Sequence, residues 1–402
     1  MRKTKRTNKD GSTVSYLQLA HNERHAVTGN PVAKVIWNFG REDSVDKDAL
    51  RRLMQSIARV LDPEDQIAVE MGIELGSISI ESDKSLGGAW ALDQLWTKLG
   101  IRSAFEELLR ERQFEAPVER AVFAMTANRA LAPWSKPAME DWVENDVCID
   151  GLGQVQVHQL YRAMDLLVEN HEHVQERVFF SMANLLNLEV DLVYFDTTST
   201  YFEVDPDPDE EEELRRTGYS KDRRPDLLQV VIGLAVTRDG IPVRCWVWPG
   251  NTGDMEVVAQ VKKEARLDGK YLLRTSDDTL SPEDVALGYK QLLEVEDAFR
   301  TLKSTLDLRP MYHRVSDRIR AHVLLCWLAL LLVRVAETQV GDTWPRIRTQ
   351  LERIRIVEIN TPEGEIAQRT DITPAQKRVL SSLGVPEPKK IREIRLKNRV
   401  RA

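Results

Sequence analysis

The spacing of the hydrophobic residues changes near residue 190, and this change restricts the folds that the chain can adopt. Between residues 86 and 188, apolar residues recur every three or four positions, as they do on one face of a helix. From Val190 onward they alternate or form continuous β-branched runs, which indicates strands. Long helical patterns return at residues 282–305 and 319–337. Strands followed by helices within one region predict an α/β layout.

The strand region also contains a hairpin signal. The segment 238–241, Arg-Asp-Gly-Ile, lies between two apolar runs and favours a tight turn. A helix is expected after these strands, at about residues 256–265. The expected strands are residues 191–196, 227–236, 241–248 and 270–274.

The first 85 residues follow a different pattern. Two short alternating stretches, 13–19 and 33–39, each come after a cluster of turn residues, which predicts a small antiparallel sheet. A helix is expected at residues 46–61, where leucines and an isoleucine share one face. A small basic sheet can lie in a DNA groove. Packing of the sheet against the next domain is an equally good interpretation.

Residues 86–188 resemble a module rich in helix-turn-helix units, because short helical patterns are separated by Gly100 and by residues 132–137. Arg120, Arg129 and Lys136 are candidates for contacts with DNA phosphates in this module. The alternative is that these side chains simply form the polar face of the helices.

Charge is distributed unevenly along the chain. A formal net charge of −8 is unusual for a DNA-binding protein, because Lys and Arg that neutralise phosphates supply most non-specific affinity. Both ends are nevertheless basic, at residues 2–6 and 389–401, while residues 205–213 form an acidic run. Such runs are typical of solvated, flexible segments.

The composition argues against several other classes of protein. The longest apolar run, residues 323–333, is about half the ~20 residues needed to span a bilayer, so we interpret it as a buried core helix. No apolar segment follows the basic N-terminus, so we expect a cytoplasmic protein without a secretory signal or membrane anchor. Cys148, Cys245 and Cys326 are odd in number and lack CxxC spacing, which argues against a disulfide framework and a zinc site.

A carboxylate stands at the predicted end of the first strand. Asp196 follows the apolar run 190–195 and precedes Thr197, Thr198 and Ser199. These small hydroxyl residues leave room for a hydrated metal ion and can orient the carboxylate. The simpler alternative is that Asp196 does not bind a metal ion.

A second carboxylate, Glu296, lies within the helical pattern of residues 282–305. Tyr289 precedes it by seven residues and Lys303 follows it by seven, which is nearly two helical turns in each direction, so all three lie near one face. This arrangement would place a cation and a phenol beside the carboxylate, where they suit a phosphate group. The alternative is a solvated lysine and a core tyrosine.

Together the two carboxylates predict a metal-dependent site that acts on phosphodiesters. Mg²⁺, or Mn²⁺ in its place, prefers oxygen ligands and keeps several waters, so a few carboxylates and a substrate phosphate suffice. Two such ions about 3.5–4 Å apart can activate an attacking oxygen and stabilise a leaving oxygen.

Tyr289, Glu296 and Lys303 stand in the register of a Y-x2-R-x3-E-x6-K signature, and with residues 194–199 they give the chain a resemblance to the DDE transposases of bacterial insertion sequences. Leu292 occupies the arginine position of that signature, and Arg300, one turn after Glu296, is a candidate replacement. The resemblance continues through residues 86–90, 184–191, 248–252 and 308–314.

The resemblance implies an RNase H-like core in which Asp196 and Glu296 are two of three acidic metal ligands. The second ligand of such transposases is an aspartate in an apolar-Ala-Asp-Arg-Gly-Phe context, and no such segment lies between these two residues. We therefore infer an internal deletion near residues 258–266. Asp277 or Asp278, after the predicted strand 270–274, is a candidate substitute ligand, with Asp254 a weaker one. The simpler interpretation is that Asp277 and Asp278 form a solvated turn or cap the next helix.

The expected function is that of an insertion-sequence transposase, which cleaves DNA at the inverted-repeat ends of its element and joins them to target DNA as a homo-oligomer. The deletion predicts that this copy binds DNA but cleaves it weakly. The alternatives are a catalytically silent DNA-binding remnant and an RNase H-type nuclease. The predicted regions are a β-hairpin and helix region at 1–85, a helical DNA-binding region at 86–188, the catalytic core at 189–340, and a helical and basic tail at 341–402.

Overall fold

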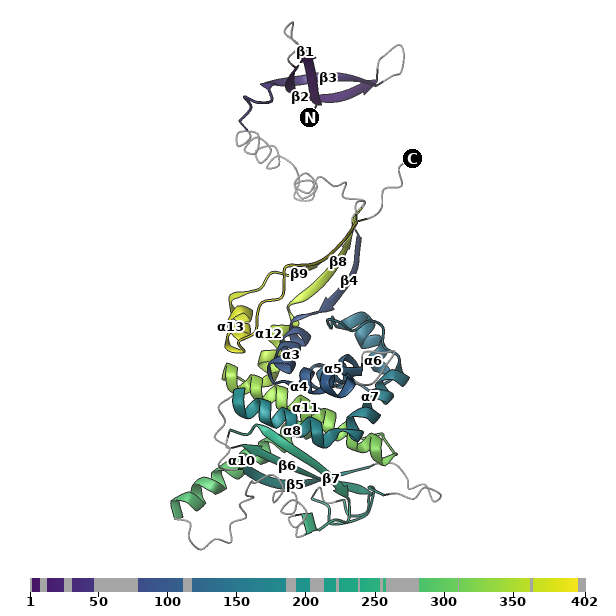
Figure 1. The fold of residues 1–402 in the computed structure, drawn as a ribbon, viewed down its shortest axis with the longest axis vertical. Helices are drawn as coiled ribbons and strands as arrows, with labels where there is room; N and C mark the ends of the chain where they lie inside the picture. The colour runs from purple at the N-terminus through teal and green to yellow at the C-terminus, as the bar shows by residue number, and fades with distance from the viewer. Residues whose placement is uncertain are drawn as a thin grey trace. The chain divides into compact units, whose positions relative to one another are not determined.

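The computed structural model divides the chain into two compact units, Met1–Ile78 and Ser79–Ala402 (Figure 1). It combines helices and sheets, which agrees with the predicted α/β composition. The structure describes residues 2–7, 13–24, 31–46, 79–110, 118–185, 193–202, 213–221, 224–237, 239–253, 256–257, 282–309, 311–361 and 364–396.

The first unit contains a three-stranded antiparallel sheet. Its strands are β1 (Arg2–Thr7), β2 (Thr13–Arg24) and β3 (Pro31–Arg41), in the order β1-β2-β3. The two alternating stretches of the sequence lie in β2 and β3. No side chain of this sheet whose burial is described is buried, so these residues form no interior of their own. The helix expected at residues 46–61 lies outside the described residues from position 47 onward.

After its first strand, the second unit continues with a layer of helices. Gly100 joins α3 to α4 in the left-handed conformation (φ 71°), and a Cβ there would lie 2.4 Å from the Ser181 hydroxyl oxygen. The helix α5 is buried along its whole length, which explains why its polar residues need partners inside the protein. The helices are α3 (Gly87–Lys98), α4 (Ile101–Leu109), α5 (Val118–Leu131), α6 (Ala138–Asp141) with a π-helical turn at Trp142–Asp146, α7 (Val157–Glu169) and α8 (His171–Leu185).

The central sheet of this unit consists of β5 (Val193–Tyr201), β6 (Gln229–Thr237) and β7 (Pro242–Pro249), which are antiparallel and lie in the order β5-β6-β7. The predicted hairpin joins β6 to β7, with Gly240 at φ 73°. The prediction that this strand ends at Asp196 is wrong. The β-branched residues after it extend β5 to Tyr201, and Asp196 pairs with Leu234 within the ladder.

Asp196 lies on the face of this sheet that adjoins the main hydrophobic core. Side chains alternate along a strand, so Tyr194 shares this face with Asp196. Tyr194 and the cross-strand Leu234 are buried in the same core as Val295 and Phe299 of helix α10 (Pro282–Ser304). Helix α10 therefore covers the face that carries Asp196.

The opposite face of the sheet holds a separate aromatic group. Trp246 and Trp248 stack with ring centroids 6.0 Å apart, and Phe195 meets both rings edge-on. These residues form a small cluster with Val231 and Val257. Within the described residues, α10 contributes nothing to this cluster.

Helix α10 runs beside β5 in the same direction. Glu294 pairs with Arg334 of α11 (Ser316–Val340) at 3.0 Å, and the Nε of Arg334 donates to the carbonyl of Gly240 at 3.4 Å. That turn lies next to the start of β5, because the first residue of β5 pairs with the last residue of β6. Beyond the helix, the guanidinium of Arg309 lies 5.8 Å from the ring of Tyr201, the last residue of β5. Contacts near both ends therefore hold α10 and β5 side by side.

The C-terminal part adds a second sheet, in the order β10-β9-β8-β4 (Figure 1). It pairs strand β4 (Ser79–Ser85), from the start of the unit, with β8 (Arg355–Asn360). The tail predicted to be helical and basic thus contains strands as well. Its remaining elements are α12 (Trp344–Glu352), β9 (Gly364–Arg369), α13 (Pro374–Ser382) and β10 (Ile391–Leu396).

Helix α11 is the core helix that the apolar run at 323–333 predicts, because every residue of that run is buried. It is the one helix in the described residues that is long and apolar enough to cross a membrane. Since it lies mostly inside the protein, as the core helix of a soluble protein does, its composition is weak support for a membrane span.

Candidate active site

Asp196 lies near the beginning of β5, with its side chain 42% exposed. The Nζ of Lys221 is 3.6 Å from its Oδ1 atom. Lys221 was not among the residues expected at the site. It lies 24 residues after Thr197, and no regular spacing in the sequence connects it to Asp196.

The hydroxyl residues after Asp196 bind Lys221. Its Nζ donates to the carbonyl of Thr197 at 2.6 Å and to the Oγ1 of Thr197 at 2.7 Å. Its backbone N–H donates to the Oγ of Ser199 at 3.0 Å. Two of the residues expected to leave room for a metal ion thus hold a lysine beside the carboxylate.

The segment that carries Lys221 is attached to the sheet by a buried glutamine. The Nε2 of Gln229, the first residue of β6, donates to the carbonyl of Tyr219 at 3.0 Å and to that of Gly250 at 2.9 Å. Arg216 exchanges two backbone hydrogen bonds with Gln229. A Cβ at Gly218 would lie 2.2 Å from the Gly250 carbonyl, so the two backbones approach too closely for any larger residue. The Trp-Pro-Gly-Asn-Thr segment at 248–252 therefore supports the Lys221 segment.

Glu296 is an exposed residue of α10, next to the buried Val295. It lies two residues, or about 3 Å of helix rise, beyond Glu294. Glu294 is level with the beginning of β5, where Asp196 also lies. The fold thus brings the elements that carry Asp196 and Glu296 side by side. The expected approach of the two carboxylates to within ~4–6 Å stays a prediction.

The other residues of the helix signature have different environments. Lys303 is half-buried near the end of α10. Arg300 pairs with Asp297 at 2.7 Å and its side chain is 68% exposed, so it is held on the solvent side of the helix. Tyr289 and Leu292 lie in α10, but their side chains are outside the described part of the structure.

Asp196 and Glu296 have the chemistry that a hard divalent cation requires, since both are accessible carboxylates. In the described residues, no three His, Cys, Asp or Glu side chains form a group that could hold a metal ion. The substitute ligands proposed above, Asp254, Asp277 and Asp278, lie outside the described residues, as does the predicted strand 270–274. Their role stays a prediction.

Three basic residues of the helical region lie inside the protein, so the hypothesis that they contact phosphate is wrong. Arg120 donates to Asp93 at 2.7 Å and to Glu119 at 2.6 Å. Arg129 donates to the carbonyls of Trp134 and Asp307. Lys136 is 3% exposed.

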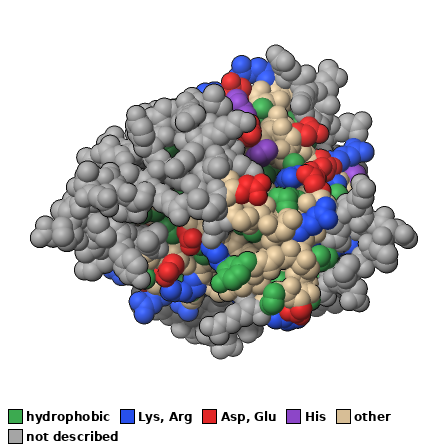
Figure 2. Space-filling view, turned by 90° about the horizontal axis from the view of Figure 1, so that it is seen from below, with side chains coloured by type: hydrophobic (Ala, Val, Ile, Leu, Met, Phe, Trp, Pro, Cys, Tyr) green, Lys and Arg blue, Asp and Glu red, His purple; other side chains and the backbone are tan. Residues whose placement is uncertain are grey.

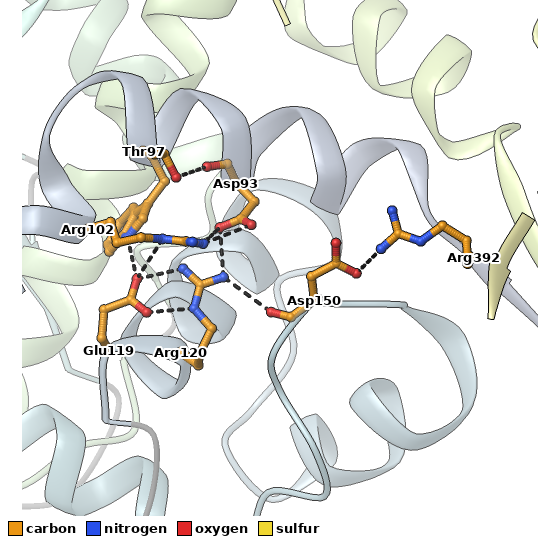
Figure 3. A network of polar contacts seen from close by, with 8 residues as sticks. Asp93, Thr97, Arg102, Glu119, Arg120, Asp150 and Arg392 are labelled. Atoms are coloured by element: carbon orange, nitrogen blue, oxygen red, sulfur yellow. Dashed lines mark hydrogen bonds and ion pairs between the residues drawn. The ribbon is translucent and has the colours of Figure 1, made fainter. Parts of the chain in front are cut away.

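The Arg120 contacts belong to a wider ionic network (Figure 3). Arg102 of α4 donates to Asp93 of α3 at 2.8 Å, and Asp150 pairs with Arg392 of β10. Burial disfavours the charged form of Arg120, but the carboxylates of Glu119 and Asp93 outweigh burial and raise its pKa. The ion pairs of Asp93 join α3 to α4 and α5, and the buried Arg120 is not available to a nucleic acid.

On the face of the molecule shown in Figure 2, the described acidic and basic side chains are interspersed. They do not form one continuous basic surface there. This distribution agrees with the net charge of −8.

A model for the N-terminal domain of the IS1634 family of transposases matches residues 1–66. The match includes the β1–β3 sheet and supports an insertion-sequence transposase. No curated protein and no solved structure matches the chain.

Proposed function

We propose that this protein is a DDE-type transposase of an insertion sequence, with Asp196 and Glu296 as carboxylates of its catalytic site. The observation that carries the proposal is the position of α10 on the Asp196 face of the central sheet, parallel to β5. The N-terminal family match favours a transposase over a general RNase H-type nuclease.

In this proposal the chain's own residues hold the reacting groups. Asp196 and Glu296 supply carboxylate oxygens for Mg²⁺ or Mn²⁺, and the bound metal would activate a water or 3′-hydroxyl and stabilise the leaving oxygen. Lys303 and Tyr289, each seven residues from Glu296 in the sequence of α10, would bind the phosphates of the DNA end. Arg300 would join them only after leaving Asp297.

Reduced cleavage is part of the same proposal. The sequence lacks the Ala-Asp-Arg-Gly-Phe segment that carries the second aspartate of such transposases, so one metal ion would be held poorly. A DNA-binding remnant that occupies element ends, or enters multimers with intact copies, is the second candidate function. The missing segment is the observation that favours it.

Cleavage assays with the full-length protein test these candidates. Duplexes that carry the inverted repeats of the element should be bound, with little nicking in Mg²⁺ and slightly more in Mn²⁺. Asp196→Asn and Glu296→Gln should remove the residual nicking and leave DNA binding unchanged. Efficient Mg²⁺-dependent nicking would rule out a catalytically silent remnant. Residual nicking that neither substitution reduces would rule out Asp196 and Glu296 as the catalytic site.

A further inference from the structure

We infer that Lys221 is a positioning residue of the candidate site, a built-in counter-cation that sets how tightly Asp196 binds a divalent metal ion. The inference rests on the proposed function, because it takes Asp196 as a metal ligand. It begins from the position of the Lys221 ammonium 3.6 Å from the Asp196 carboxylate.

The hydrogen bonds show that Asp196 is not the main anchor of the ammonium. A lysine ammonium has three donors. The carbonyl and hydroxyl of Thr197 accept from the Lys221 Nζ at 2.6 and 2.7 Å. The separation from Asp196 is longer than the 2.7–3.2 Å of an ordinary N–H···O hydrogen bond. The positive charge is therefore fixed by neutral partners, and it would stay in place when Asp196 binds another cation.

The position of Lys221 is built into the fold. Its own backbone N–H is bound by Ser199, and two residues earlier the Tyr219 carbonyl is bound by the buried Gln229. The close contact of Gly218 with Gly250 fixes the same segment from the other side. An ordinary surface lysine would keep most of its rotamer freedom, whereas this one is held at both its backbone and its ammonium.

A fixed positive charge beside Asp196 repels a divalent cation that approaches the same carboxylate oxygens. The repulsion is reduced once a DNA phosphate reaches the ammonium, because the phosphate neutralises it. Metal binding and DNA binding are then coupled, each strengthening the other.

The affinity of the full-length protein for Mn²⁺, measured without DNA from the electron paramagnetic resonance signal of free Mn²⁺, tests the inference. We expect Lys221→Met to bind Mn²⁺ about threefold to tenfold more tightly than the parent, because a unit charge within about 4 Å is removed. Lys221→Arg keeps the charge and should stay within twofold of the parent. Asp196→Asn should lose the binding.

Lys98→Met is the matched control, since Lys98 is also held by a backbone carbonyl, that of Leu383 at 3.3 Å, but in helix α3. It should leave the Mn²⁺ affinity unchanged. Equal or weaker binding by Lys221→Met, with binding lost in Asp196→Asn, would overturn the inference and leave the proposed metal site standing. Unchanged binding by Asp196→Asn would overturn both. Thermal unfolding of each variant shows whether the Lys221 segment has kept its fold. If Lys221→Met has lost it, Lys221→Gln gives the same test, because a glutamine amide can still donate to Thr197 but carries no charge.

Discussion

Lys136 is a lysine that the fold keeps away from water. Its side chain lies near Arg129 and Cys326, and its Nζ donates no hydrogen bond within the described part of the chain. Burial, with a smaller contribution from the charge of Arg129, lowers its pKa to about 7. The neighbouring His313 has its pKa lowered to about 4, also mainly by burial. Both side chains are therefore more readily neutral in the folded protein than in the unfolded chain.

The pH dependence of stability follows from this shift. The unfolded chain binds a proton on Lys136 up to about pH 10.5, whereas the folded protein releases it above about pH 7. The free energy of unfolding should therefore rise with pH between about 7 and 10.5. Below about pH 7 the folded protein bears the full cost of keeping the buried amine charged. Lys136→Met should remove this rise and stabilise the protein at pH 7 by on the order of 2–4 kcal/mol, since each pKa unit corresponds to about 1.4 kcal/mol.

Urea unfolding at several pH values between 6 and 10 measures the effect. Lys377→Met, at a side chain that is 67% exposed, should keep the parent's pH profile. A Lys136→Met protein that unfolds with the parent's pH dependence would show that the buried amine is not the cause.

At the scale of elements, the turn after β7 determines where the Lys221 segment lies. A Cβ at Gly250 would be 2.1 Å from the Gln229 carbonyl and 2.3 Å from the Arg216 carbonyl, and both of these are backbone atoms that cannot rotate away. Gly250→Ala should therefore destabilise the protein by about 1–3 kcal/mol, as overpacking does. It should also tighten Mn²⁺ binding, because a shift of this segment moves the Lys221 ammonium, which repels the metal ion, away from Asp196.

Gly253→Ala is the control for this substitution, because its Cβ would meet no atom within 4 Å. It should change stability by less than about 0.5 kcal/mol in the same urea titration. Equal stability of the two variants would mean that the turn adjusts without cost and does not fix the segment.

The sequence predicted the elements whose pattern is local. The apolar runs of β6 and β7 with the Gly240 turn, the buried run of α11 and the long helix α10 are examples. The end of β5 was placed too early because Asp196 is a poor strand residue, whereas the ladder with β6 continues past it. Strand β8 was missed because its residues were assigned to a helical tail. It pairs with the nearby β9 and also with β4, which lies more than two hundred residues away. Lys221 was missed for a similar reason, since only the hydrogen bonds of its segment bring it to Asp196.

At the scale of the whole molecule, the distribution of charge is the main constraint on how the chain meets DNA. The family match covers the N-terminal sheet, where β1 is the strongly basic strand. Lys3 and Lys5 share one face of this sheet with Trp37, because Lys3 pairs with Leu17, and Leu19 on the same face pairs with Trp37. Trp37 is 65% exposed. This face thus combines cations with an exposed aromatic ring.

We expect this face to contribute to DNA binding by the full-length protein. Lys5→Ala should reduce the slope of log K against log salt concentration by about 0.9, because one phosphate contact is lost. Trp37→Ala should weaken binding by about tenfold and leave the salt slope unchanged, because an uncharged contact is lost. Lys377→Ala, a charge-matched change in the second unit, should alter neither quantity. Fluorescence anisotropy with a labelled duplex between about 50 and 200 mM salt measures both quantities. If Lys5→Ala and Trp37→Ala both bind as the parent does, this prediction is wrong and the DNA contact lies elsewhere.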